Sequence, residues 1–307
     1  VLESLIKEVN KEMLSLAELS EEERDALADR LVDEISADYG NTILKSSARN
    51  EYMIQRTKRM VRRTVWAIQK QLKSGEFEPE GVEVVFQGGR IDRVDTMETD
   101  DGKLYVRVID YKTGNTSFDL VSLYHGLQLQ LMIYMDGALT VEQNKHKDKD
   151  VIPAGVFYYN IKDPMIQEKI DADVKAVSAG LMKELKMNGL VQADPELVYR
   201  MDSSLGSIPV AFNKDGSFRK NSSVADRTQF AVLGRYVRTK IEKIRSSILE
   251  GDAEVSPYEL GKKNACTYCP YMTVCGFDRR LSGYEFRRLK QFADEEIWKA
   301  FAKEVED

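Results

Sequence analysis

The chain has 307 residues, of which 42% are hydrophobic and 31% charged, a composition typical of a globular protein with one large domain or two small ones. The formal net charge is −6, which argues weakly against nucleic acid as a partner on bulk electrostatics. No apolar run approaches the length of a membrane span and no signal peptide is visible, so we expect no membrane partner and a cytoplasmic location.

Residues 1–78 are predicted to form an N-terminal helical segment. Ser20 and Glu23 match a capping box, and the helix that follows is expected to end at residues 39–41. A second long helix is predicted over 48–74. It carries a dense group of basic side chains, for which a solvated helix face is as good an explanation as a binding surface: Arg56, Lys58, Arg59, Arg62 and Arg63.

Residues 79–223 are predicted to contain a sheet. GVEVVF at 81–86 reads as a first strand, and GRIDRVD at 89–95 alternates as a half-buried strand should. The Asp-Asp-Gly sequence at 100–102 signals a tight turn, so LYVRVIDYK at 104–112 is expected to fold back antiparallel.

Three charged residues of this hairpin are predicted to converge. Asp110 and Lys112 are two residues apart in a strand and therefore project from the same face. If Asp92 faces the same side, two carboxylates and an ammonium meet at one end of the hairpin. Two carboxylates are hard oxygen ligands suited to Mg²⁺ or Mn²⁺. A surface hairpin with exposed ion pairs is the alternative explanation for these residues taken alone.

A helix is predicted over 119–138. Gln130 and Tyr134 are four residues apart and therefore stack on one face, which Gly126 continues one turn earlier. The polar flank of an amphipathic helix would explain Gln130 or Tyr134 singly. The opposing apolar stripe is expected to pack on the sheet and consists of Leu123, Leu127, Leu131 and Met135.

The remaining elements are predicted with less detail. AGVFYYNI at 154–161 has the near-continuous apolar and aromatic character of a strand buried on both faces. Helices are expected within 171–187, and Asp-Gly at 215–216 suggests another hairpin. Residues 224–307 are predicted to form a C-terminal helical segment, with a long helix over 225–249, and the three segments are expected to pack as one compact domain.

The chain has three cysteines, and all lie in one stretch at positions 266, 269 and 275. The first two have C-x₂-C spacing, which suits zinc or an iron–sulfur cluster because the short turn points both thiolates at one ion. Three thiolates do not complete a Cys₄ set, and a disulfide is unattractive in a cytosolic protein. His125 and His146 are weak candidates for the fourth ligand.

Taken together, GRID at 89–92, IDYKTG at 109–114 and Q-x-x-x-Y at 130–134 resemble the RecB-type branch of the PD-(D/E)XK nucleases. The resemblance implies an α/β fold with a mixed sheet, a restriction-endonuclease-like core flanked by helices. It further implies that Asp92, Asp110 and the backbone carbonyl of Tyr111 hold Mg²⁺ or Mn²⁺, and that Lys112 is the catalytic lysine.

The same resemblance suggests where DNA would lie. Gln130 and Tyr134 would line the DNA-facing side of the site, and Gly126 would leave room for a backbone to come close. Glu83 is a candidate for an additional acidic residue, although a solvent-facing strand position explains it as well. The basic helix would supply phosphate contacts at i, i+3 and i+7, namely Arg56, Arg59 and Arg63.

The order of motifs over nearly the whole chain, including RRTVWA at 62–67 and SPYELG at 256–261, is most similar to the AddB family of bacterial helicase–nuclease proteins. In that family one upstream cysteine and three C-terminal cysteines spaced C-x₂-C-x₅-C hold a [4Fe–4S] cluster. The resemblance assigns the three to Cys266, Cys269 and Cys275. The first cysteine, like the family's N-terminal His or Glu motif, is expected before Val1, so we expect this chain to be a fragment with an incomplete cluster and metal site.

The function implied by the resemblance is a Mg²⁺-dependent deoxyribonuclease, an exonuclease acting in double-strand break repair and recombination. It would hydrolyse a DNA strand fed to it by an AddA-type helicase partner. A non-catalytic DNA-binding or subunit-docking module is one alternative, against which the intact set of Asp92, Asp110 and Lys112 argues. Another RecB-like exonuclease, such as a CRISPR-associated one, is a second alternative, but such chains usually carry a cysteine near the N-terminus.

Overall fold

The computed structural model describes residues 1–11, 15–39, 43–166 and 173–306. They divide into two compact units. Unit 1 comprises residues 1–118 and 131–230, and unit 2 comprises residues 119–130 and 231–307. Each unit is described below on its own.

Unit 1 begins with helices, as predicted: α1 (Leu2–Lys11), α2 (Glu21–Asp38), the short 3₁₀ helix η1 (Ile43–Lys45) and α3 (Ala48–Lys73). The capping box at α2 is present, because Ser20 Oγ accepts the Glu23 N–H at 3.2 Å and Glu23 Oε2 accepts the Ser20 N–H at 3.0 Å. The predicted end of α2 at residues 40–41 lies outside the described residues.

The sheet of unit 1 contains six strands among the described residues, in the order β1-β2-β3-β4-β5-β6. Strands β1 to β3 form an antiparallel meander, and β4 then pairs parallel with β3. β5 is antiparallel to β4 and parallel to β6. The sheet is therefore mixed, as predicted. Its strands are β1 (Glu78–Phe86), β2 (Gly89–Glu98), β3 (Lys103–Lys112), β4 (Asp150–Asn160), β5 (Asn188–Gln192) and β6 (Val224–Ala225).

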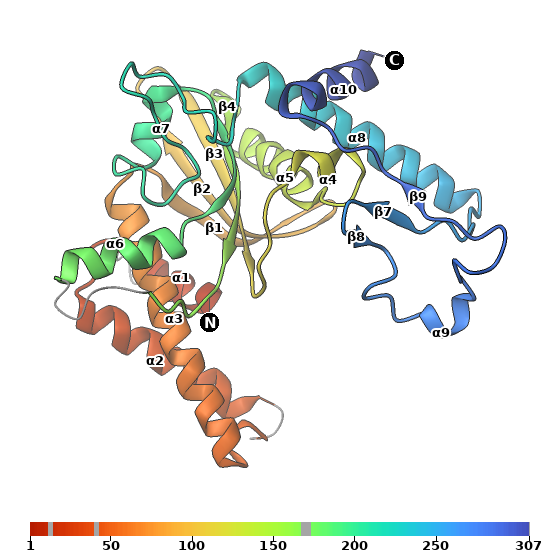
Figure 1. Cartoon of the computed structure of the whole chain (residues 1–307). Coiled ribbons are helices and arrows are strands. Elements are labelled where there is room, and N and C mark those ends of the chain that lie inside the picture. The colour runs from red at the N-terminus through yellow and green to blue at the C-terminus, as the bar shows by residue number, and fades with distance from the viewer. Residues whose placement is uncertain (12–14, 40–42, 167–172, 307) are drawn as a thin grey trace. The chain divides into compact units, whose positions relative to one another are not determined.

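Helices lie on both faces of this sheet (Figure 1). On one face, α3 and α7 (Pro195–Met201) pack against strand residues in one hydrophobic cluster that includes Ala67, Ile109, Phe157 and Leu197. The other face carries α5 (Gln130–Lys145), whose Leu131 is fully buried. A layer of helices on each side buries both faces of the central strands, so β4 reads as an almost continuous apolar run.

The helix predicted over 119–138 is wrong in one respect, because the chain forms two helices there. α4 (Leu120–Tyr124) and α5 are separated by a break in which Gly126 has φ +79°. Glycine adopts this left-handed conformation at little steric cost, so the helix can end at that point. Gly126 consequently does not continue the helix face of Gln130 and Tyr134, whereas those two residues are one turn apart on α5 as predicted.

Later elements of unit 1 were predicted unevenly. The helix expected within 171–187 is α6 (Val174–Glu184), and residues 171–172 lie outside the described part of the chain. The hairpin expected around 215–216 is present as a bridge between Phe212 and Phe218. β5 and α7 were not predicted, although Asp194 followed by Pro195 is a helix-start signal: Asp194 caps α7 by accepting two backbone N–H groups.

Unit 2 contains most of α8 (Arg227–Leu249), where a long helix was predicted, followed by small elements around the cysteines. A short sheet has the order β8-β7-β9. Tyr124 of α4 stacks on Tyr236 of α8 at 5.5 Å between ring centroids and meets Phe301 edge-on at 5.4 Å. No helix in the described residues is both long and apolar enough to cross a membrane. The small elements are β7 (Tyr258–Leu260), β8 (Lys263–Asn264), α9 (Met272–Cys275), β9 (Arg287–Arg288) and α10 (Asp294–Glu306).

Candidate functional site

The two aspartates predicted to converge do so at one end of the β2–β3 pair. Arg93 pairs with Ile109, and continuing the antiparallel register by one residue places Asp92 opposite Asp110 on the same face. Asp92 Oδ2 accepts the backbone N–H of Tyr111 at 2.8 Å, which fixes this carboxylate against β3. The local signals were sufficient here, since strand alternation and the turn at residues 100–102 determine the register.

Lys112 joins the two carboxylates. Its Nζ lies 2.6 Å from Oδ2 of Asp110, and the Asp110 side chain is 2% exposed while that of Lys112 is 27% exposed. Burial raises the pKa of Asp110, the neighbouring Lys112 opposes this shift, and the charge of Asp92 adds to it. Oδ2 of Asp110 is buried and accepts no hydrogen bond among the described residues, so the ammonium is its polar contact.

Two tyrosines complete the described surroundings of Asp110. Tyr158 of β4 pairs with Asp110 in the ladder, and its ring centroid lies 5.5 Å from Nζ of Lys112. Burial, with the charges of Asp110 and Tyr134, raises the pKa of Tyr158 to about 12. Tyr134 reaches this region from α5 and meets Phe86 edge-on at 5.9 Å. Tyr158 was not predicted, because nothing in the run of aromatic residues in β4 distinguishes it from its neighbours.

Gln130 and Gly126 belong to unit 2. Gln130 is the first residue of α5 and stands one turn before Tyr134. The predicted contacts of both residues with DNA remain predictions.

A cavity of about 470 Å³ lies beside Asp92. On the sheet side it is lined by Val82, Glu83, Asp92, Tyr111 and Thr113. This volume is in the range of cavities that hold small ligands or parts of larger ones. The contribution of α1 was not foreseen, since nothing local in its sequence indicates that it packs beside β2. The helical side is contributed by α1 and α3 through Leu2, Glu3, Ile6, Thr57, Met60, Val61 and Thr64.

Glu83 lies across the ladder from Asp92, between the pairs Val82–Arg93 and Val84–Ile91. Its φ of +53° is unusual for a residue with a side chain, and such backbone strain costs on the order of 1–3 kcal/mol. Its carboxylate forms an ion pair with Arg90. Within the described ranges, no three acidic, histidine or cysteine side chains are arranged to hold a metal ion.

The residues present nevertheless fit a Mg²⁺ or Mn²⁺ ion. Asp92 and Asp110 provide two hard oxygen ligands on one face, and the buried Oδ2 of Asp110 accepts no hydrogen bond among the described residues. Mg²⁺ usually binds proteins through one or two carboxylates and takes its remaining ligands from water and substrate phosphates. A pair of carboxylates beside an open cavity meets that requirement without a third acidic side chain.

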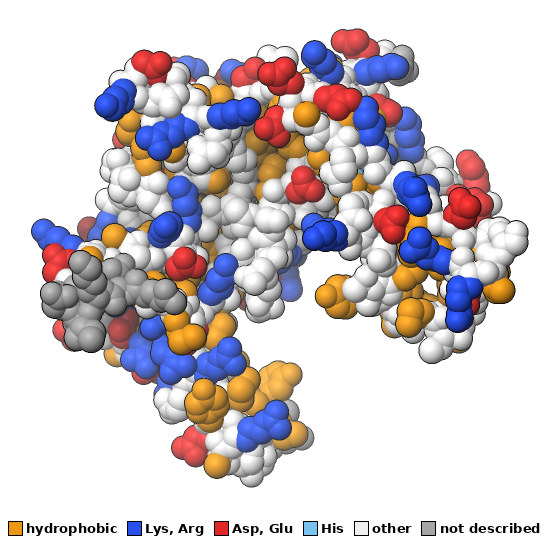
Figure 2. All heavy atoms as spheres, viewed as in Figure 1, with side chains coloured by type: hydrophobic (Ala, Val, Ile, Leu, Met, Phe, Trp, Pro, Cys, Tyr) orange, Lys and Arg blue, Asp and Glu red, His pale blue; other side chains and the backbone are white. Residues whose placement is uncertain are grey.

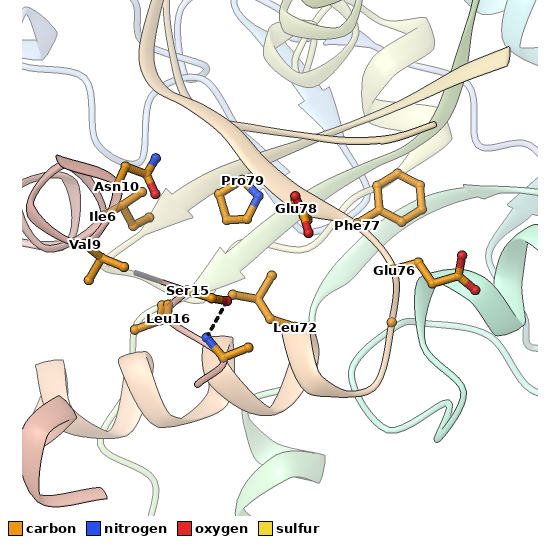
Figure 3. A pocket seen from close by; sticks show the side chains of 12 residues that line it. Ile6, Val9, Asn10, Ser15, Leu16, Leu72, Glu76, Phe77, Glu78 and Pro79 are labelled. Atoms are coloured by element: carbon orange, nitrogen blue, oxygen red, sulfur yellow. Dashed lines mark hydrogen bonds between the residues drawn. The ribbon is translucent and has the colours of Figure 1, made fainter. Parts of the chain in front are cut away.

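A second cavity, of about 220 Å³, lies between α1, residues 15–17, the end of α3 and the start of β1 (Figure 3). Ile6, Val9, Leu16 and Leu72 give it an apolar side, and Glu76 and Glu78 are among its polar lining residues. Its described lining includes none of the predicted site residues.

A buried charge network lies on the opposite face of β2 and β3 from the two aspartates. The side chains of Arg93 and Asp95 are fully buried, and that of Arg107 is 1% exposed. Asp95 accepts hydrogen bonds from Arg93 at 2.5 and 2.7 Å and from Arg107 at 2.7 Å. Arg93 also donates to the hydroxyl of Tyr111 at 3.3 Å, which connects the network to the strand segment between Asp110 and Lys112. The strand pattern gave no indication of buried arginines.

The basic residues of α3 largely face acidic partners. Lys58 lies 2.6 Å from Asp33, and Arg62 lies 3.1 Å from Asp29, both on α2. Arg59 and Arg63 instead share one partner beyond β4, described below. Arg56 is exposed. Figure 2 shows Lys and Arg side chains gathered over this helical region.

The three cysteines of unit 2 are free thiols in the described structure. Burial raises the pKa of Cys266, and the charges of Cys269 and Cys275 add to the shift, so the three sulfurs are close enough to interact. The two histidines have other partners: His125 Nε2 lies 2.8 Å from the carbonyl oxygen of Lys290, and His146 lies 3.7 Å from Glu142.

Comparison with known proteins gives consistent matches. A family model described as the PD-(D/E)XK nuclease superfamily matches residues 1–276. The chain is 40% identical over 326 residues to an ATP-dependent helicase/deoxyribonuclease subunit of Lachnoclostridium phytofermentans, covering 99% of this chain and 28% of the relative. Proteins of the same name from Alkaliphilus metalliredigens and Thermoanaerobacter sp. are 33% and 34% identical, with the same coverage. The chain thus spans 28% of the length of these relatives.

Proposed function

The chain belongs to the PD-(D/E)XK nuclease superfamily, and from this membership we propose that it is the DNA-cleaving domain of an AddB-type protein in a helicase–nuclease complex. The observation that carries the proposal is the meeting of Asp92, Asp110 and Lys112 on one face of the sheet beside a cavity. The relatives named as helicase/deoxyribonuclease subunits support the same activity.

In this proposal Asp92, Asp110 and the backbone carbonyl of Tyr111 hold Mg²⁺ or Mn²⁺. When bound, the ion supplies activation of a water molecule and neutralisation of charge on the phosphodiester. Lys112, held against Asp110, places a compact positive charge where negative charge develops on the scissile phosphate. The hydrogen bond from the Tyr111 N–H orients the Asp92 carboxylate before any ligand binds. Gln130 and Tyr134 are proposed to contact the DNA strand.

The proposal extends to the longer protein. An AddA-type helicase partner would deliver the strand, and the exonuclease would act in double-strand break repair in the cytoplasm. Cys266, Cys269 and Cys275 would share a [4Fe–4S] cluster with one further cysteine elsewhere in that protein. Support for the cluster comes from the spacing of the three thiols and from their electrostatic interaction.

The metal requirement tests the proposal. The full-length protein with its helicase partner is incubated with linear DNA in which each strand carries a different label. We expect cleavage of one strand to stop in excess EDTA and to return on addition of Mg²⁺ or Mn²⁺. Fragments of that strand that continue to form in EDTA would contradict a metal-dependent nuclease, as would DNA that is bound with either ion but never cut.

A further inference from the structure

Arg59 and Arg63 stand one helical turn apart on α3 and hold the same carboxylate. Asp163 Oδ2 lies 2.6 Å from Nε of Arg59, and its Oδ1 lies 2.6 Å from Nη1 of Arg63. Arg63 also donates to the carbonyl oxygen of Pro164 at 2.6 Å. One anion therefore occupies a clamp made of two guanidinium groups, the arrangement that proteins use for carboxylates and phosphates alike.

The clamp adjoins the nuclease site along the backbone. Ile161, two residues before Asp163, donates its N–H to the carbonyl oxygen of Lys112 at 2.8 Å. Ile161 also lines the cavity beside Asp92, together with Thr57 and Thr64 of the arginine-bearing helix. A strand whose scissile phosphate lies at Asp110 and Lys112 would therefore pass this helix as it leaves the cavity.

Exposure distinguishes this clamp from the other ion pairs of the helix. The Asp163 side chain is 16% exposed, whereas Arg59 and Arg63 are 47% and 33% exposed. In the Lys58–Asp33 pair the order is reversed, with the lysine 12% exposed and the aspartate 59% exposed. At the clamp the guanidinium groups face solvent and the carboxylate lies behind them. Each guanidinium has five N–H donors, so a phosphate can approach from the solvent side.

We propose that Arg59 and Arg63 bind a backbone phosphate of the DNA strand, and that Asp163 occupies this site as an internal anion when DNA is absent. The inference rests on the proposed nuclease function and adds a competition to it, because carboxylate and phosphate draw on the same two guanidinium groups. Asp163 keeps the arginines in place before binding and lowers the affinity for DNA.

The test is the affinity for a fluorescein-labelled single-stranded oligonucleotide, measured by anisotropy in EDTA over a range of salt concentrations. Asp163→Asn removes the competing charge, and we expect affinity to rise about 3- to 10-fold, as the loss of two partly exposed ion pairs allows. Asp33→Asn is the matched control, since it removes the same charge from Lys58 on the same helix. We expect the control to change affinity less than about 2-fold.

The double variant Arg59→Gln/Arg63→Gln provides a second readout. Loss of two phosphate contacts should reduce the slope of log affinity against log salt by about 1.4, at roughly 0.7 per contact on a single strand. Equal effects of Asp163→Asn and Asp33→Asn, or an unchanged slope in the double variant, would overturn the inference while leaving metal-dependent cleavage intact. If the wild-type protein and every variant bind no DNA, the proposed function fails together with the inference.

Discussion

Replacing Asp110 by alanine is expected to reduce cleavage of one DNA strand by at least about 100-fold, the scale on which loss of a charge-stabilising group slows an enzyme. The substitution removes one of the two carboxylates proposed to hold the metal ion, and leaves Lys112 without its partner at 2.6 Å. The measurement is the initial rate of cleavage of each labelled strand by the full-length protein in its complex.

Asp100→Ala is the control for this prediction. Asp100 is an exposed carboxylate in the turn at the far end of the same strand pair. We expect this variant to cleave at the wild-type rate, and unwinding by the helicase partner to be equal in all three proteins. A wild-type cleavage rate for both strands with Asp110→Ala would remove Asp110 from the site.

Replacing Asp95 by asparagine is expected to have the largest effect on stability. Asp95 is fully buried between the guanidinium groups of Arg93 and Arg107, both of which would lose their negative partner. Burial disfavours the charged carboxylate, but the two arginines outweigh it and lower the pKa of Asp95. Breaking a buried ion pair by removing one partner costs about 3–5 kcal/mol, which is a large part of the roughly 5–15 kcal/mol typical of a domain.

The free energy of unfolding in urea measures this effect. Asp101→Asn is the matched control, because Asp101 forms an exposed ion pair with Lys103 at the turn of the same hairpin. We expect the control to change the free energy of unfolding by less than about 1 kcal/mol. If both variants unfold at the same urea concentration as the wild type, the buried network does not hold β2 and β3 together.

The parts of the site that could be predicted are those determined by local patterns. Alternation along β2 and β3 and the turn between them fix a register, and the register alone places Asp92 beside Asp110. The spacing of Gln130 and Tyr134 likewise survived, because it depends only on the helical repeat of α5. The break at Gly126 was missed because glycine is also tolerated within helices, and its left-handed conformation is not evident from the residue alone.

Long-range contacts account for what could not be predicted. Arg93 and Arg107 occupy positions where a strand facing a core should carry apolar side chains, and only the partner across the ladder makes their burial possible. Asp163 is separated from Arg59 by more than a hundred residues, so the internal anion of the clamp has no local signature. The lining of the cavity by α1 is of the same kind, since it depends on how the helix packs beside β2.

The most direct test of the proposed metal site is the binding of Mn²⁺ to the full-length protein without DNA, followed by electron paramagnetic resonance. Asp110→Asn preserves the shape of the side chain and removes its charge, and Asp100→Asn makes the same change at an exposed position. We expect Mn²⁺ binding by the wild type and by Asp100→Asn, and a loss of affinity of at least about 10-fold with Asp110→Asn. Equal Mn²⁺ affinity in all three proteins would contradict a metal site formed by Asp92 and Asp110.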